Sequence, residues 1–146
     1  MTLPRWTHIA LQVADIEASI AFYAAHTPLE LLDQREDANG FGAWLGHREQ
    51  AEAPFILVLA QFFPGKGPYG DLPSRIGPFG HLGIELESRA AVDAAAASAE
   101  ASGCLQAPAV DLPPPIGYVC MVNDPDGNTI EFSHNQGVYD FFERRA

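Results

Sequence analysis

The sequence predicts an α+β fold in which two βαβββ modules follow one another along the chain. The main observation is an internal repeat: the segment THIALQV at 7–13 has a counterpart, GHLGIEL, at 80–86, in which His81 takes the place of His8. In both segments apolar residues alternate with histidine and with small or polar residues, the pattern of a half-buried β-strand. One helix pattern and three short strand patterns follow each segment, so the same order of elements is predicted twice.

Each of these first strands leads into a capped helix. Asp15 precedes a helix expected over 16–26, and Ser88 precedes an alanine-rich helix expected over 90–102. Both residue types accept hydrogen bonds from the amides that begin a helix. Gly103 is placed to end the second helix, because glycine readily adopts the left-handed conformation found at helix ends.

Three strand patterns complete each module, at 29–35, 41–47 and 54–61 in the first half and at 104–110, 116–123 and 128–134 in the second. The turn NDPDGN at 123–128 combines a proline, which presets φ, with a glycine, which tolerates positive φ. We therefore expect a tight hairpin between the last two strands. That hairpin would set the register of Glu131.

The 146 residues are predicted to form a single domain over 1–146, with module one at about 5–61 and module two at about 79–134. The linker 62–78 is rich in glycine and proline, which excludes a helix or a central strand. A plain connection is favoured over a lid. The C-terminal tail 135–146 carries Val138, Tyr139, Phe141 and Phe142, so we expect it to pack on the domain or on a second subunit.

Composition excludes several classes of function. The chain is 47% hydrophobic and 18% charged, as a globular protein is. Its net charge of −11, from 8 basic and 19 acidic residues, would repel nucleic acid and anionic lipid. No apolar run fits a secretory signal or a membrane span, so we expect a soluble, cytoplasmic protein. Cys104 and Cys120 are expected to be buried free thiols.

The chemistry is expected from His8, His81 and Glu131. The two histidines occupy matching positions of the repeated strands, and Glu131 lies in the strand that completes module two. Strand alternation places each of the three on the face opposite its apolar neighbours. Two imidazoles and one carboxylate form the set that binds Fe(II), Mn(II) or catalytic Zn(II) with coordination positions left open.

Three segments, THIALQVADIEASIAFY, GHLGIELES and VNDPDGNTIEFSH, resemble in order the signatures of the vicinal oxygen chelate superfamily, which includes glyoxalases, bleomycin-resistance proteins and extradiol dioxygenases. The resemblance covers nearly the whole chain. It implies an open, cup-shaped mixed sheet with the helices outside. It also implies that His8, His81 and Glu131 bind one divalent metal ion (Fe, Mn, Zn or Ni), and it implies a small-molecule substrate and a homodimer.

One position departs from the glyoxalase I pattern. The interval that separates His8 from His81 also separates Val58 from Glu131, and Val58 stands where glyoxalase I has a fourth ligand, a glutamate. Valine cannot ligate a metal, so the usual glyoxalase I reaction is placed in doubt. A three-ligand set looks more like the extradiol dioxygenases, which add a tyrosine and a histidine beside the metal. Tyr118 and His134 are the candidates for those catalytic roles.

Several activities stay open from the sequence. Fosfomycin-resistance thiol transferases also use three ligands, but they need clustered basic residues, and the cations of this chain are scattered. The favoured interpretation is a metal-dependent enzyme, dioxygenase-like or glyoxalase/lyase-like, that chelates adjacent oxygens of a small substrate. The alternative is a metal-free small-molecule or drug-binding protein of the bleomycin-resistance type. Such proteins usually lack the ligand set, so its retention favours an enzyme.

Overall fold

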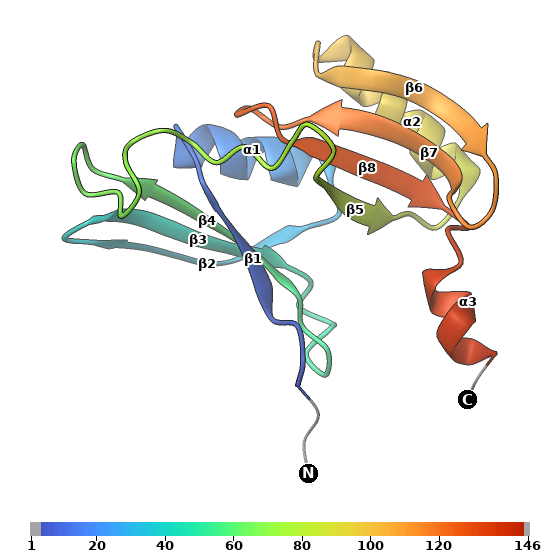
Figure 1. Ribbon diagram of the computed structural model, residues 1–146, viewed down its shortest axis with the longest axis horizontal. Helices are drawn as coiled ribbons and strands as arrows, with labels where there is room; N and C mark the ends of the chain where they lie inside the picture. The colour runs from blue at the N-terminus through green and yellow to red at the C-terminus, as the bar shows by residue number, and fades with distance from the viewer. Residues whose placement is uncertain (1–3, 145–146) are drawn as a thin grey trace. The chain divides into compact units, whose positions relative to one another are not determined.

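The computed structural model describes residues 4–144 and contains the βαβββ order twice (Figure 1). The first set is β1 (His8–Gln12), α1 (Ile16–His26), β2 (Glu30–Asp37), β3 (Gly40–Gly46) and β4 (Ile56–Phe62). The second is β5 (His81–Glu85), α2 (Arg89–Ala101), β6 (Leu105–Leu112), β7 (Gly117–Asn123) and β8 (Thr129–His134), followed by α3 (Val138–Glu143). The chain divides into two compact units, with the boundary after Arg75, inside the predicted linker.

Each unit contains one open, mixed, four-stranded sheet. The strand order is β1-β4-β3-β2 in the first unit and β5-β8-β7-β6 in the second. In each, the first and last strands of the module pair in parallel and the other neighbours are antiparallel. His8 pairs with Ile56 and His81 pairs with Thr129, so the interval between the sequence repeats holds in the strand register as well. The predicted α+β fold of two tandem modules is confirmed.

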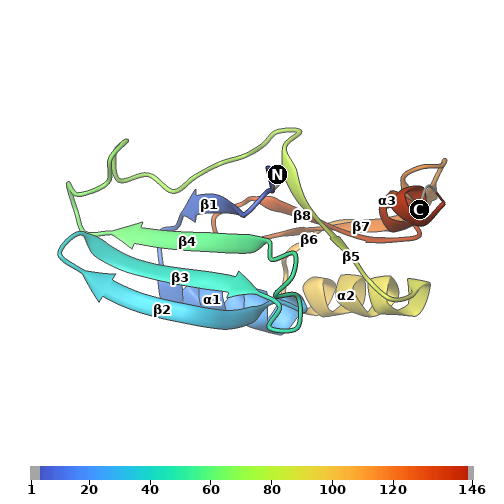
Figure 2. The same ribbon diagram turned by 90° about the horizontal axis from the view of Figure 1, so that it is seen from below.

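One helix covers one face of each sheet. Helix α1 packs on β2, β3 and β4, as Figure 2 shows, and α2 packs on β6, β7 and β8. The apolar side chains between helix and sheet are fully buried, among them Tyr23, Leu59, Val92 and Phe132. Because side chains alternate along a strand, the residues between these apolar positions point to the face without a helix. That alternation decides where the candidate ligands lie.

The helix boundaries follow the predicted caps. The Asp15 carboxylate accepts the Ala18 amide hydrogen at 3.0 Å, and α1 has the predicted bounds. The Ser88 hydroxyl accepts the Ala91 amide hydrogen at 3.1 Å, and α2 begins and ends one residue earlier than predicted. Gly103 follows with a φ of +73°, a left-handed conformation that suits glycine.

The predicted hairpin joins β7 to β8. The Asp124 side chain accepts the amide hydrogens of Asp126 and Asn128 at 3.0 and 2.8 Å, and Gly127 has a φ of +86°. This turn places Met121 opposite Glu131. The hairpin therefore gives Glu131 a defined register against β7, as the sequence predicted.

Burial of the thiols and of the tail differs in part from expectation. Cys120 is 1% exposed and Cys104 is half-buried, both as free thiols. Burial raises the pKa of the Cys120 thiol to about 11. The tail forms α3, and none of the side chains of residues 138–143 is buried, so the expected packing on the domain is not found there. Packing on a second subunit, the other expectation, stays a prediction. Residues 145–146 lie outside the described residues. Within the described range no helix is long and apolar enough to cross a membrane.

The repeat predicts matched core substitutions in the two units. Leu59 and Phe132 occupy equivalent positions, opposite Leu11 and Ile84, and both are 0% exposed. We expect Leu59→Ala to lower the free energy of unfolding by about 2–5 kcal/mol and Phe132→Ala by about 3–5 kcal/mol, because each leaves a cavity. Denaturant unfolding measures both. Leu112→Ala and Phe142→Ala, at exposed positions, are the controls, and equal losses in controls and core variants would contradict the assigned core.

Candidate metal site

His81 and Glu131 approach one another on the face of the second sheet that carries no helix. The parallel pairing of β5 with β8 places Gly83 beside Glu131 and His81 two residues away on the same face. The His81 Nε2 and Glu131 Oε2 atoms are 3.7 Å apart. The Glu131 side chain is 7% exposed and that of His81 is 31% exposed. A buried carboxylate thus lies beside a partly accessible imidazole.

The orientation of the His81 ring is set by a second hydrogen bond. Its Nδ1 atom lies 2.9 Å from the Phe79 carbonyl oxygen. A carbonyl can only accept, so Nδ1 carries the hydrogen, and in the neutral ring Nε2 keeps its lone pair. The Phe79 ring also contacts the imidazole edge-on, with centroids 5.8 Å apart. Nε2 is the ring nitrogen on the side of Glu131, and an Nδ1 held by a backbone carbonyl is an arrangement that metal-binding histidines have.

The second oxygen of Glu131 has a partner that the sequence did not indicate. The Gln136 Nε2 group donates a hydrogen bond to Glu131 Oε1 at 2.7 Å. A carboxylate removed from water needs such partners, because burial otherwise disfavours its charge. Gln136 lies beyond the end of β8, and no strand periodicity could place it at this carboxylate.

Glu85 holds the backbone of the same turn. Its Oε1 atom accepts the amide hydrogens of Asn135 at 3.0 Å and of Gln136 at 3.4 Å. Glu85 pairs with Ser133 and shares the β5 face with His81. Alternation along 81, 83 and 85 puts Glu85 on the face of His81, so strand periodicity contains a signal for this residue.

His8 occupies the equivalent position of the first unit. It lies on β1, and its Nδ1 atom is 2.9 Å from the Thr7 hydroxyl oxygen. Two residues along β1, Ala10 pairs with Val58, as Gly83 pairs with Glu131 in the second unit. The structure thus confirms that Val58 is the positional counterpart of Glu131. Its side chain has no ligand atom.

Neither unit contains a full ligand set of its own. Within the described part of each unit, no group of three or more His, Cys, Asp or Glu side chains could hold a metal ion. The second unit contributes the pair His81 and Glu131. The nitrogen and oxygen donors of that pair fit the first-row divalent metals.

Tyr118 and His134 lie on the other face of the second sheet. They pair with each other across β7 and β8, and alternation puts them on the side of Phe132 and α2, opposite Glu131. The Tyr118 hydroxyl donates to the Asp93 carboxylate at 2.5 Å. The His134 Nδ1 atom is 3.0 Å from the Leu86 carbonyl oxygen. The structure therefore does not bring these two residues to the Glu131 carboxylate.

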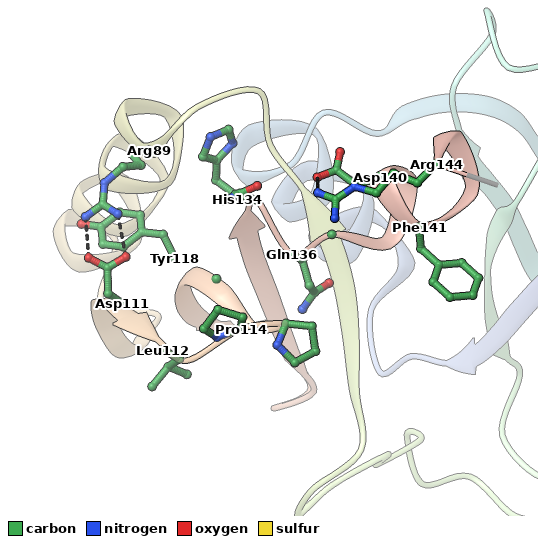
Figure 3. A pocket seen from close by; sticks show the side chains of 14 residues that line it. Arg89, Asp111, Leu112, Pro114, Tyr118, His134, Gln136, Asp140, Phe141 and Arg144 are labelled. Atoms are coloured by element: carbon green, nitrogen blue, oxygen red, sulfur yellow. Dashed lines mark hydrogen bonds and ion pairs between the residues drawn. The ribbon is translucent and has the colours of Figure 1, made fainter. Parts of the chain in front are cut away.

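A cavity of about 800 Å³ opens beside Tyr118 (Figure 3). Arg89 covers the Tyr118 ring at 3.8 Å from its centroid and binds the Asp111 carboxylate through two contacts of 2.6 and 2.8 Å. The hydrogen bond raises the pKa of Arg89 and lowers that of Asp111. Gln136 also lines this cavity, so one side chain contacts both the cavity and the Glu131 carboxylate.

One protein family matches most of the chain. Residues 5–132 match the model of the Glyoxalase/Bleomycin resistance protein/Dioxygenase superfamily. The uncharacterized protein PA2024 of Pseudomonas aeruginosa is 41% identical over 133 residues, which are 91% of this chain and 90% of that protein. The match therefore spans nearly the full length of both proteins.

Solved structures share the fold at lower identity. Leishmania major glyoxalase I, described as trypanothione-dependent, superposes with a TM-score of 0.70 at 21% identity, over 98% of this chain and 95% of that one. Zea mays glyoxalase I gives 0.70 at 23%, over 88% of this chain but only 43% of the maize chain, so this chain spans less than half of that protein. TnmS3, an antibiotic binding protein from Streptomyces, gives 0.62 at 25%, over 92% and 98%.

The contacts of Tyr118 predict an altered titration. The hydrogen bond to Asp93 raises the pKa of Tyr118, because it favours the protonated phenol beside a carboxylate. Asp93→Asn should therefore lower the pKa of Tyr118 toward the ordinary value of about 10. Ultraviolet absorbance of tyrosinate measures the titration, and Tyr118→Phe identifies which part of it belongs to this residue. An unchanged titration in Asp93→Asn would contradict the contact.

Proposed function

Because this chain belongs to the Glyoxalase/Bleomycin resistance protein/Dioxygenase superfamily, we propose that it is a metal-dependent enzyme of the vicinal oxygen chelate type. One divalent ion, Fe, Mn, Zn or Ni, binds to His8, His81 and Glu131. The observation that carries the proposal is the approach of His81 Nε2 to Glu131 Oε2 at 3.7 Å, with His81 Nδ1 held by the Phe79 carbonyl.

The spacing of these two donors supports a shared ion. Metal bonds of about 2.0–2.2 Å at tetrahedral or octahedral angles put neighbouring ligand atoms roughly 3–3.5 Å apart. The observed 3.7 Å is slightly longer, so a small rotation of either side chain brings both donors to bonding distance. His8 is the third ligand in this proposal, since it is the positional counterpart of His81 in the repeated sheet.

A bound divalent ion supplies a Lewis acid that takes up two neighbouring oxygens of a small substrate and stabilises negative charge on them. Val58 keeps the fourth protein position empty of ligand atoms, which favours a dioxygenase-like site with room for two substrate oxygens. A glyoxalase-like or lyase-like reaction is the second form of the same proposal. Tyr118 and His134 have no part in it, because they face away from Glu131.

Binding without catalysis is the second candidate function. It is favoured by the likeness of the fold to that of TnmS3, an antibiotic binding protein. In that case a drug-like molecule binds without metal, and His81→Ala leaves its affinity unchanged. The exposed apolar side chains of α3 support a further part of the proposal, a homodimer in which a second subunit covers them.

His81→Ala tests the metal site. We expect the variant to lose stoichiometric metal while keeping its fold, because His81 lies on the helix-free face and is not part of the core. Metal content is measured after purification without chelator, and circular dichroism reports the fold. His47→Ala, outside the ligand set, is the matched control. Full metal occupancy in His81→Ala would show that the assigned site is wrong.

Activity of the same proteins separates the reaction types. The metal-loaded protein is assayed on catechols with Fe(II) and oxygen, and on glutathione hemithioacetals with Ni(II) or Zn(II). Turnover should disappear on chelation, return with the metal and be absent from His81→Ala. Ligand binding by chelated protein without any turnover would instead support the binding function.

Val58→Glu tests the positional equivalence of the two modules. A carboxylate there would add a fourth ligand, so we expect metal binding to tighten and one open coordination position to be lost. Metal affinity is measured by titration of the chelator-stripped protein. Val58→Gln has a side chain of the same length without the charge and should leave affinity near the wild-type value. Equal affinities for the Glu and Gln variants would contradict the proposed placement.

A further inference from the structure

We propose that Gln136 is a positioning residue for the metal site, which holds one oxygen of the Glu131 carboxylate so that the other faces His81. The inference rests on the proposed function, since it concerns the ligand role of Glu131. Gln136 Nε2 donates to Glu131 Oε1 at 2.7 Å, while Glu131 Oε2 is 3.7 Å from His81 Nε2. The two carboxylate oxygens thus have separate partners.

The chemistry of an amide suits this role better than that of a cation. A carboxyl group rotates about its last side-chain bond, and a donor on one oxygen restricts that rotation. Lysine or arginine would also donate, but their positive charge would oppose a divalent ion at the same carboxylate. The amide of Gln136 fixes the orientation and leaves the negative charge of Glu131 available.

The backbone of Gln136 is itself held in place. Asn135 has a φ of +61° and Gly137 a φ of +78°, so the chain turns sharply on both sides of Gln136. Glu85 Oε1 accepts the amide hydrogens of Asn135 and Gln136 at 3.0 and 3.4 Å. This turn directs the Gln136 side chain back to Glu131. Glu85 therefore acts on Glu131 indirectly, because it holds the turn that carries Gln136.

The two proposed ligands of the second unit, His81 and Glu131, lie close to Glu85 and Gln136 in one group of neighbouring side chains. His81 and Glu85 lie on the same face of β5, and Glu131 lies beside them on β8. Outer hydrogen bonds of this kind orient ligating carboxylates, and their removal typically weakens metal binding about 10–100-fold. Gln136 and Glu85 are assigned that role for Glu131.

Gln136→Leu in the full chain tests the role, because leucine keeps the bulk and removes the donor. We expect Zn(II) to bind the chelator-stripped variant about 10–100-fold more weakly than it binds wild type. The visible spectrum of the Co(II)-loaded variant should also change, since the carboxylate oxygen is no longer oriented. Gln106→Leu is the matched control: Gln106 accepts a 2.7 Å hydrogen bond from the β8 residue Thr129 but does not contact Glu131. Its affinity and spectrum should equal those of wild type.

Two further variants test the same idea from other directions. Gln136→Asn keeps the amide but is one methylene shorter, so it should resemble Gln136→Leu. Glu85→Gln keeps the Gln136 side chain and weakens the hold on its backbone, so its loss of affinity should be smaller and in the same direction. Circular dichroism of the metal-free proteins should match that of wild type for all four variants. Gln136→Leu should unfold at a lower temperature, because the buried Glu131 carboxylate loses a hydrogen-bond donor.

The outcomes separate this inference from the proposed function. Wild-type protein that takes up no Zn(II) or Co(II) would overturn the proposed function, and this inference with it. Wild-type protein that binds metal, together with Gln136→Leu of equal affinity and an identical Co(II) spectrum, would overturn only the positioning role. An equal loss of affinity in Gln106→Leu and Gln136→Leu would also overturn it. If Gln136→Leu fails to fold, a wild-type spectrum and affinity in both Gln136→Asn and Glu85→Gln would do so.

Discussion

The parallel pairing of the first and last strands of each module is the constraint on which the candidate site depends. In the second unit it brings β5 beside β8, so that His81 and Glu131, which are distant in the chain, share one face within 3.7 Å. In the first unit the same pairing joins β1 to β4 in the equivalent register. Each helix covers the opposite face of its sheet, so the chemical side chains and the apolar core are kept apart by alternation.

Because Glu131 is buried, its carboxylate oxygens need particular partners in the protein. A carboxylate whose side chain is 7% exposed loses most of its hydration, and hydrogen bonds or a cation must replace it. Gln136 supplies one such bond, and the other oxygen faces an imidazole whose ring is anchored on the Phe79 carbonyl. One oxygen of Glu131 thus accepts a hydrogen bond from Gln136, and the other faces His81. That asymmetry distinguishes it from a carboxylate that is merely satisfied in a protein interior.

The two modules share a scaffold but differ at one chemically decisive position. Val58 and Glu131 hold equivalent places in strand register, and only the second has ligand atoms. A site built from such modules needs no new fold to change its ligand number, because one side chain on the helix-free face is enough. Membership of the superfamily defines the scaffold, and the two modules differ on it at this residue pair.

The sequence by itself determined the repeat, the βαβββ order, the helix caps and the face on which His81 and Glu131 lie, because alternation and capping are local properties of the chain. It also placed Val58 as the counterpart of Glu131. It did not predict that Tyr118 and His134 would face α2, although the alternation from Phe132 contained that information for His134. Only the tertiary structure decided the contact of Gln136 with Glu131, because this contact depends on a turn with positive φ at Asn135 and Gly137 and on the hold of Glu85 from another strand. Contacts of that kind follow from how the chain returns on itself, which no local pattern encodes.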